Sequence, residues 1–369
     1  MKWIEFRLTS LIVGVSLMLV VGCSQPVWGM GKNRLPREPL RSKDLPKKHP
    51  KAPEYFAICT ATADGRNFKE IIKDPRRAVT HGRVSKDHQW ITFTRHNKFN
   101  ARGIAIPETS YKETEILMCR IDGSEIQTLV PPKKGATNCN SYWTPDGKSI
   151  IYVSSDNPEK KGRIYLLDIE TRTRKQLSTP DGYDAGDPYT DGTHVVFPAR
   201  KPNVRGGHVI HIMNMDGTGF RRLSSVPQRQ AKGEYDPKIS PDGKKVAFMR
   251  AGKKGMKGEI NLIVTDINTG AESNLSVPAS NNWDAMPEWS SDGKRLIFWH
   301  VNRKEPLKSG LYTITADGSD RRRISLPKGY QYTICSFWPG TGSGPDAKII
   351  FSVRKFSPQI RRQIEQMQK

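Results

Sequence analysis

Short apolar runs separated by polar turns recur along the chain from residue 54 to residue 355. In the clearest example, residues 288–298, an Asp-Gly pair lies between a short apolar run and an alternating run of β-branched and aromatic residues. Asp-Gly provides the positive φ that a tight turn between two twisted strands needs, so each such segment predicts a β-hairpin. Six hairpins of this kind, some of them degenerate, have their turns at Asp87, Asp146, Asp191, Asp242, Asp292 and Asp346.

A second series of hairpins lies between the members of the first. Each begins with an apolar strand, as in residues 209–212, and most continue through a turn and a polar run that closes on an apolar residue such as Leu223. The turns of this series are at Asp64, Asp122, Asp168, Asp216, Asp266 and Asp317. Successive turns within either series are 45 to 59 residues apart. Two hairpins per period make a four-stranded blade, so we predict an all-β, six-bladed β-propeller over residues 54–355.

The order of the hairpins predicts how the ring closes. The chain opens with an outer hairpin at Tyr55 and ends with an inner hairpin that includes residues 349–353. One blade must therefore combine strands from both ends of the chain, with Ile71 on its outer strand and residues 334–337 on its inner strand. Such a shared blade leaves no long free sheet edge.

Residues 1–22 have the pattern of an export signal. Lys2 and Arg7 precede the apolar run of residues 8–21, which is short for a membrane span and ends at Gly22 and Cys23. The segment resembles a bacterial lipoprotein signal, which implies cleavage before Cys23, acylation of that residue and firm membrane anchoring. The alternative is a plain secretory signal with an incidental cysteine. Ser24 favours the outer membrane over the inner one, on the periplasmic side.

Charge and proline locate the segments outside the propeller. Residues 23–53 are rich in proline and basic residues and lack apolar periodicity, so we expect an extended tether with a reach of up to roughly 90 Å. Residues 356–369 form a basic tail in which a short helix is one option. The net charge is +23, and about +12 of it falls on the propeller.

The cysteines do not indicate a metal site. The spacing of Cys59, Cys119, Cys139 and Cys335 fits no zinc motif, so we expect no metal and no other cofactor. Export permits disulfides. Because Cys59 and Cys335 are expected on strands of the shared blade that are not neighbours, buried thiols are the preferred prediction.

The hairpin motif resembles a known family. The Trp-Ser/Thr-Pro/Ser-Asp-Gly-Lys hairpins, together with the Asp-Gly turns of the outer hairpins, are similar to the repeats of the TolB-type β-propeller, a periplasmic component of the Tol system. The resemblance covers residues 54–355 and implies the fold. The same repeat also builds propellers of prolyl oligopeptidase relatives and of oligogalacturonate lyases. The amino-terminal α/β domain of TolB itself is missing from this sequence, where the tether takes its place.

Blade topology sorts the loops onto two faces. We expect the Asp-Gly turns on one face, and the second-to-third-strand and inter-blade connections on the other. The second-to-third connections are basic, as at Lys160, Arg163, Arg250 and Lys253, and predict a basic rim. The inter-blade connections predict partner-binding residues at the channel mouth, namely His81, Asn138, Asp184, Glu234 and Asp284. The alternative is that Asp184, Glu234 and Asp284 only cap backbone amides at strand starts.

Three tryptophans recur in the hairpin motif. Trp143, Trp289 and Trp338 are placed at one repeat position, which predicts packing between blades, with sugar stacking as the alternative.

The sequence lacks common enzyme motifs. It has no Gly-x-Ser-x-Gly elbow, no His-Glu-x-x-His helix and no phosphate-binding glycine loop. Lyases with this repeat bind a metal through several histidines near the mouth, whereas only His81 lies at an inter-blade loop here.

These observations predict a lipid-anchored, non-catalytic scaffold of the bacterial envelope that binds a protein or peptide at the channel mouth. The alternative is a binder or lyase of acidic polysaccharide. The basic rim could contact anionic glycan or lipid headgroups. We expect a monomer that binds no nucleic acid.

Overall fold

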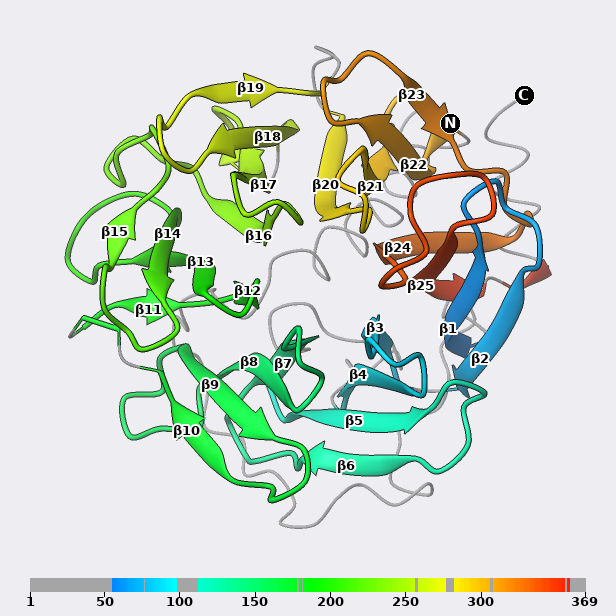
Figure 1. The fold of residues 1–369 in the computed structure, drawn as a ribbon, viewed down its shortest axis with the longest axis horizontal. Coiled ribbons are helices and arrows are strands. Elements are labelled where there is room, and N and C mark those ends of the chain that lie inside the picture. The colour runs from blue at the N-terminus through cyan, green and yellow to red at the C-terminus, as the bar shows by residue number, and fades with distance from the viewer. Residues whose placement is uncertain are drawn as a thin grey trace, which may run out of the picture.

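The computed structural model describes residues 55–75, 77–97, 112–177, 179–180, 182–255, 258–276, 282–305, 308–355 and 357–358. Six four-stranded blades are arranged around one axis, with the first strand of each blade nearest the centre (Figure 1). The prediction of an all-β, six-bladed propeller is confirmed. The predicted signal, Cys23, the tether and nearly all of the basic tail lie outside the described residues. Within them, no helix is long and apolar enough to cross a membrane.

Five blades follow one another along the chain. Blade 1 contains β3 (Val79–Val84), β4 (Trp90–His96), β5 (Thr114–Arg120) and β6 (Gln127–Val130). Blade 2 contains β7 (Asn138–Trp143), β8 (Ser149–Ser154), β9 (Arg163–Asp168) and β10 (Arg174–Gln176). Blade 3 contains β11 (Asp184–Ala185) and β12 (Tyr189–Thr190), which both pair with β13 and together take the place of the inner strand, followed by β13 (His194–Arg200), β14 (Val209–Asn214) and β15 (Arg221–Arg222). Blade 4 contains β16 (Glu234–Ile239), β17 (Lys245–Ala251), β18 (Ile260–Asp266) and β19 (Glu272–Asn274). Blade 5 contains β20 (Trp283–Trp289), β21 (Arg295–Val301), β22 (Gly310–Thr315) and β23 (Arg321–Arg323).

The sixth blade is shared between the two ends of the propeller. Its strand order is β2 (Lys69–Asp74), β1 (Tyr55–Thr62), β25 (Lys348–Lys355) and β24 (Tyr330–Phe337). β1 and β25 are antiparallel and pair over eight residues each, from Tyr55 opposite Lys355 to Thr62 opposite Lys348. The predicted closure of the ring is therefore confirmed.

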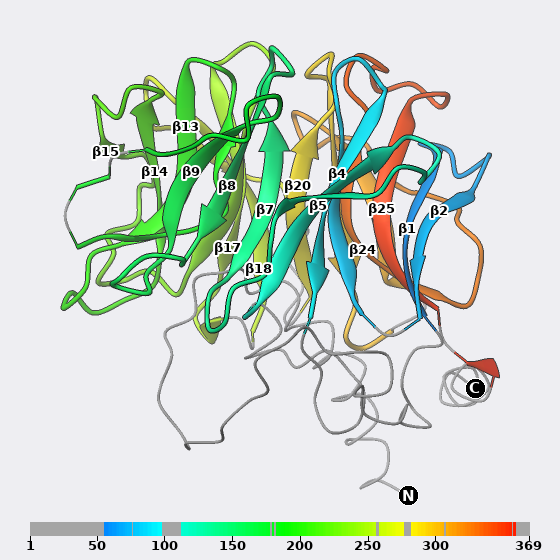
Figure 2. The same cartoon turned by 90° about the horizontal axis from the view of Figure 1, so that it is seen from below.

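The propeller has two different faces. The hairpin turns within each blade lie on one side, which we call the turn face, and the connections between β-hairpins and between blades lie on the other, which we call the loop face (Figure 2). β1 starts and β25 ends at the loop face. The chain therefore enters and leaves the propeller on the same side.

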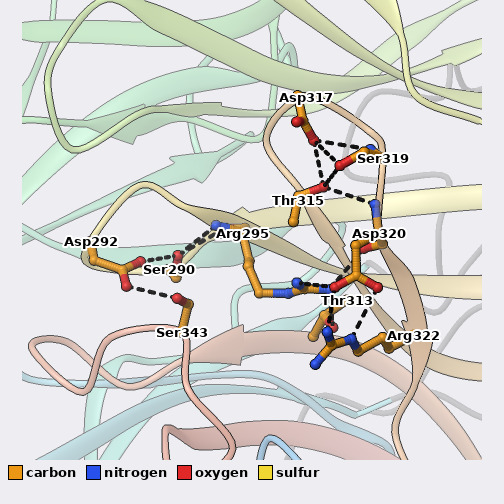
Figure 3. Close-up of polar contacts among 10 residues, drawn as sticks. All are labelled: Ser290, Asp292, Arg295, Thr313, Thr315, Asp317, Ser319, Asp320, Arg322 and Ser343. Atoms are coloured by element: carbon orange, nitrogen blue, oxygen red, sulfur yellow. Dashed lines mark hydrogen bonds and ion pairs between the residues drawn. The ribbon is translucent and has the colours of Figure 1, made fainter.

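The repeated hairpin motif is explained by a local hydrogen-bond pattern. In blade 5, Ser290 Oγ donates to Asp292 Oδ1 at 2.6 Å and accepts from the backbone N of Arg295 at 3.0 Å (Figure 3). Asp292 in turn accepts from the backbone N of Lys294 at 3.1 Å, and Gly293 has φ of +67°. The outer hairpin repeats the pattern, with Thr315 and Asp317 in place of the serine and the aspartate. The hydroxyl and the carboxylate close the turn, and the residue after the aspartate takes positive φ, which glycine adopts most readily. In blade 1 His88 takes this conformation in place of glycine.

Packing between blades uses tryptophan as predicted, with one exception. Trp143 Nε1 donates to the carbonyl of Arg83 at 3.1 Å, and Trp289 Nε1 donates to the carbonyl of Lys238 at 3.0 Å. Each indole thus joins its own blade to the inner strand of another. The placement of Trp338 at this position was wrong by one residue. Its backbone N donates to the carbonyl of Lys348, as Ser290 N does to Arg295, so it occupies the serine position.

The cysteines follow the prediction in part. Cys59, Cys119 and Cys335 are free and buried, so the expectation of buried thiols is confirmed for these three. Cys139 is also buried, and the expectation of a thiol stays a prediction at this position.

Removing β25 tests the shared blade. A chain that ends at Ala347 loses β25 and with it the two ladders that β25 forms, one with β1 and one with β24. This loss exposes two sheet edges and an apolar face. We expect the melting temperature to fall by well over 10 °C, or the chain to fail to fold, as measured by circular dichroism. A chain that ends at Lys355 keeps every paired residue and serves as the control. An unchanged cooperative transition in the shorter chain would contradict the role assigned to β25.

Candidate functional site

The innermost strands share a backbone distortion. In each blade one residue at an equivalent position has positive φ, and in five of the six blades the pairing register with the second strand shifts around it. In blade 3 this residue lies between β11 and β12. The six residues are His81, Asn140, Asp187, Asp236, Met286 and Ile334. Positive φ is costly for residues other than glycine and persists where the surrounding structure holds it, so the ring of bulges is a built feature of the channel wall.

The residues two positions after these bulges meet at the propeller axis. Arg83 of blade 1 donates to the hydroxyl of Tyr142 of blade 2, and its guanidinium carbon lies 4.4 Å from the centroid of that ring. Lys238 Nζ of blade 4 lies 4.6 Å from the same centroid. Arg83 Nη2 is 4.0 Å from Glu288 Oε2 of blade 5. The contacts of Lys238 with Tyr142 and of Arg83 with Glu288 each skip over one blade, so these side chains reach across the centre of the propeller.

Burial changes the ionisation of this cluster. Arg83, Lys238 and Glu288 are all less than a tenth exposed. Burial lowers the pKa of Lys238 and raises the pKa of Glu288, although each charge is favourable to the other. Two cations on the faces of one tyrosine are partly stabilised by cation–π attraction. The centre of the propeller is therefore a charged core rather than an apolar one.

The bulge residues of blades 2 to 4 form the second part of this cluster. The side-chain amide of Asn140 donates to Asp187 Oδ1. Burial and the neighbouring carboxylate of Asp236 raise the pKa of Asp187 to about 8. Burial also raises the pKa of Asp236. Strongly shifted groups gathered in one place are typical of functional sites, although structural networks also shift pKa values.

Several buried polar atoms in the cluster lack a hydrogen-bond partner among the described residues. They are Arg83 Nε, Asn140 Oδ1, Asp187 Oδ2, Asp236 Oδ2 and Glu288 Oε2. Four of these five atoms are acceptors, and they come from four successive blades. Unpaired buried polar atoms are expensive, and folded proteins usually satisfy them with ordered water. We define these five residues with Tyr142 and Lys238 as the channel cluster.

Sequence reasoning did not find most of the channel cluster. The signal was present, because an Asn, Asp or His recurs in four blades before the turn aspartate, six residues before it in three blades and four residues before it in blade 3. It was hidden because only the assembled ring shows which strand positions converge on the axis. Among the described residues, no group of three or more His, Cys, Asp or Glu side chains is placed to hold a metal ion.

Four of the predicted partner-binding residues lie near the start of the inner strand, three of them two residues before the bulge and Asp184 three residues before it. Each pairs with a polar residue of the second strand. The pairs are Asn138 with Ser154, Asp184 with Arg200, Glu234 with Arg250, and Asp284 with His300. His81 is not at this position but at the bulge, where its Nδ1 is 2.9 Å from Thr80 Oγ1. Burial lowers the pKa of His81 well below its usual value.

These inter-blade residues are bound within the propeller. Asn138 Oδ1 accepts from Ser154 Oγ at 2.7 Å, and Asp184 Oδ1 accepts from the backbone N of Gly162 at 2.9 Å. Glu234 accepts from the backbone N of Ile210 at 2.9 Å. These contacts favour the alternative of a structural role, in which the side chains join successive blades. A role in partner binding stays a prediction for all five residues.

Asp284 has the strongest partners of the set. Arg321 Nη1 and Nη2 donate to its two carboxylate oxygens at 2.8 and 2.9 Å, and His300 Nδ1 is 2.7 Å from Oδ1. Burial alone would raise the pKa of Asp284, but Arg321 and His300 lower it. A bidentate arginine–carboxylate pair of this kind is one of the stronger side-chain interactions in proteins.

The two faces of the propeller differ sharply in charge. Among the described loop-face connections, twelve basic side chains and only two acidic ones are exposed. The basic ones are Lys133, Lys134, Lys160, Lys201, Arg205, Arg229, Lys232, Lys253, Lys254, Lys304, Lys308 and Lys328. The described turns of the opposite face expose six basic and ten acidic side chains. The predicted basic rim is confirmed for most of its lysines.

Some residues predicted for the basic rim have other roles. Arg163 is buried and donates to the carbonyl of Tyr183. Arg250 forms ion pairs with Glu234 at 2.6 Å and with Glu272 at 2.7 Å. The prediction was wrong for these two arginines, because Glu159 of the same connection pairs with Arg163, and acidic residues of other strands pair with Arg250.

Comparison with known proteins agrees with this architecture. The family profile described as TolB beta propeller domain matches residues 45–335. The chain belongs to the TolB β-propeller family. It can be superimposed on the structure of a putative TolB from Agrobacterium tumefaciens with a TM-score of 0.58 and 15% identity, over 82% of this chain and 99% of that chain. For TolB from Acinetobacter baumannii, the TM-score is 0.53 at 16% identity, over 82% of this chain and 65% of that one.

Curated sequence relatives share only part of their length with this TolB-family chain. Dipeptidyl-peptidase 5 from Trichophyton equinum is 26% identical over 295 residues, which are 75% of this chain and 39% of the relative. Dipeptidyl-peptidase 5 from Arthroderma otae is 32% identical over 210 residues, which are 55% of this chain and 24% of the relative. The chain thus spans at most about two fifths of these relatives.

The raised pKa of Asp187 predicts that the stability of the folded protein depends on pH. A carboxyl whose pKa is raised by folding contributes stability that is complete below its unfolded value of 3.8 and is lost as pH rises through about 8. We expect the free energy of unfolding, measured in urea, to fall between pH 5.5 and 8.5, and Asp187→Asn to flatten that fall. Asp216→Asn is the control, because hydrogen bonds from Thr218 lower the pKa of this exposed carboxyl. Equal slopes for wild type and Asp187→Asn would refute the assignment.

Proposed function

We propose that this TolB-family protein is a lipid-anchored, non-catalytic scaffold of the bacterial envelope that holds an acidic protein partner on its loop face, around the channel mouth. The observation that carries this proposal is the charge difference between the two faces. Twelve exposed basic side chains against two acidic ones produce a positive potential over the whole loop face. Such a surface speeds association with an acidic partner and sets the side from which it approaches.

The channel itself is a less suitable binding site for a partner segment. Its cluster of Arg83, Tyr142, Lys238 and Glu288 lies buried at the axis, where these side chains reach one another across the ring. A partner is therefore placed across the mouth, in contact with the exposed lysines of the surrounding loops. Lysine is a compact charge on a flexible stem, so the face suits a partner with distributed carboxylates.

The anchor is proposed from the amino-terminal sequence. The apolar run that ends at Gly22 and Cys23 supports acylation of Cys23, and the proline-rich tether connects Cys23 to the propeller. Because β1 starts at the loop face, the tether joins the propeller on its basic side. Ser24 supports the outer membrane, with the propeller on the periplasmic side.

An acidic polysaccharide is the second candidate for the same face, as a ligand or as the substrate of a lyase. The same ring of exposed lysines that suits an acidic protein also suits a linear polyanion. The two candidates differ in salt dependence, because polyanion binding depends mostly on released counterions and is lost more steeply as salt rises.

Charge removal on each face tests the proposed surface. The loop-face variant combines Lys201→Gln, Arg205→Gln, Lys253→Gln and Lys254→Gln, and the turn-face control combines Lys148→Gln, Arg172→Gln, Lys244→Gln and Lys294→Gln. Exposed charge contacts contribute about 0.2–1 kcal/mol each, so we expect the loop-face variant to capture roughly tenfold less partner from detergent-solubilised envelopes. The turn-face variant should capture as much as wild type.

Two other outcomes of this experiment are informative. Equal capture by both variants contradicts the proposed surface. In a companion measurement, the wild-type protein is applied to immobilised alginate at rising salt. Retention at low salt that is lost at moderate salt, while protein partners remain bound, favours the polysaccharide candidate.

Acylation of Cys23 is tested by metabolic labelling. Cells that express wild type or Cys23→Ser are grown with an alkyne fatty acid, and labelled protein is detected after coupling to a dye. We expect label in the wild type only, together with loss of membrane association in Cys23→Ser. Equal labelling of the two proteins, or mass spectra that place Cys23 in a disulfide, would contradict the anchor.

A further inference from the structure

A cavity of about 190 Å³ lies between blades 4 and 5. Its floor contains the buried ion pair of Asp284 with Arg321 and His300. Its walls come from the start of β18, the segment before β20, the connection after β21 and the start of β22. It is separate from the channel cluster, because no residue of that cluster lines it.

The repeat itself explains why a cavity forms here. At the equivalent place between blades 3 and 4, Glu234 Oε2 accepts from the backbone N of Ile210 at 2.9 Å, and Oε1 accepts from Ser224 Oγ at 2.8 Å. The glutamate therefore crosses the interface and fills it. Glu234 is 1% exposed, which agrees with close packing around its carboxylate.

Between blades 4 and 5 the corresponding acid is one methylene shorter. Asp284 turns toward Arg321 and His300 of its own blade and does not reach the backbone of β18. The backbone N of Leu262, which is equivalent to that of Ile210, instead donates to Ser276 Oγ at 2.8 Å. The space that a glutamate would occupy is left between the two blades.

The lining offers many hydrogen-bond groups for a ligand. Three asparagines, Asn261, Asn282 and Asn302, contribute to the wall, and an amide can both donate and accept as a sugar hydroxyl does. Asn302 Oδ1 already accepts from two backbone N–H groups, so its amide offers a donor. Lys308 contributes a cation, which forms an exposed ion pair with Glu305 at 2.8 Å. Because Asp284 and Arg321 neutralise each other, Lys308 is the one charge of the described lining that is not paired within it.

An aromatic ring completes the wall. Tyr312 lies at a ring-centroid distance of 5.0 Å from His300 and 5.0 Å from the guanidinium carbon of Arg321, which together fix its orientation. Its hydroxyl donates to the carbonyl of Lys308 at 2.8 Å. A ring held in this way gives an apolar surface beside the amides, the combination that polar ring-shaped ligands require.

We propose that this cavity is a binding site for a single sugar residue, with a carboxylate-bearing sugar preferred over a neutral one. The volume is below the roughly 300 Å³ of pockets for drug-sized ligands, so one ring is the size that fits. The amides bind the hydroxyl groups, Tyr312 packs against the ring, and Lys308 binds the carboxylate. This site does not depend on the proposed partner surface, because it requires neither the anchor nor the exposed lysines of the other blades.

The internal repeat provides a matched pair of variants. Asp284→Glu restores the longer acid found between blades 3 and 4, keeps the charge that pairs with Arg321, and fills the cavity. Glu234→Asp makes the converse change at the other interface and leaves the cavity intact. Methyl β-glucuronide and methyl β-glucoside are the probes, with binding followed by saturation-transfer nuclear magnetic resonance and titration on the purified full-length protein.

We expect saturable binding of the glucuronide by wild type and by Glu234→Asp, weaker binding of the glucoside, and loss of about tenfold or more in affinity for Asp284→Glu, which both fills the space and withdraws hydrogen-bond groups. Asn282→Ala should also weaken binding while leaving the melting temperature nearly unchanged. Equal affinity of wild type and Asp284→Glu, or no saturable binding of either sugar by a folded wild type, would overturn the proposal.

Discussion

The antiparallel pairing of β1 with β25 joins residues near position 55 to residues near position 350 and converts a row of hairpins into a ring. Each of the other five blades is complete within one continuous stretch of chain, but none of them determines where the ring ends. Once the shared blade closes, every inner strand lies beside two others, and the distance of each strand from the axis is determined. The channel cluster, the inter-blade ion pairs and the cavity all depend on this closure.

Closure also explains why charged residues are buried at the centre. Residues two positions after the bulge of each inner strand converge on the axis, where five of the six are buried and Tyr189 is partly buried. Besides Tyr189 and Ser336, the position holds Arg83, Tyr142, Lys238 and Glu288, whose charges neutralise one another only in part. Buried networks of this type contribute less to stability than to a unique arrangement, because an unpaired charge in the wrong register would be severely penalised.

The difference between the faces has a local origin. Hairpin turns require aspartate to accept hydrogen bonds from a serine or threonine and from backbone amides, and this requirement places acids on the turn face. Longer connections on the loop face have no such requirement and carry mostly lysine. The same repeat therefore separates acidic from basic side chains, and the segment that precedes Tyr55 joins the basic side.

The sequence by itself determined the number of blades, the positions of both hairpin series and the sharing of one blade, because these follow from local turn chemistry and from spacing. It also indicated the basic loop face, since most exposed lysines have no competing partner. It could not separate Arg250 from those lysines, because the acids that pair with it, Glu234 and Glu272, come from other strands. Only the tertiary structure decided that Asp184 and Glu234 join blades while Asp284 pairs within its own blade, that charged side chains are buried at the axis, and that one interface is hollow. These features depend on which side chains from distant repeats meet and on a difference of one methylene between Glu234 and Asp284.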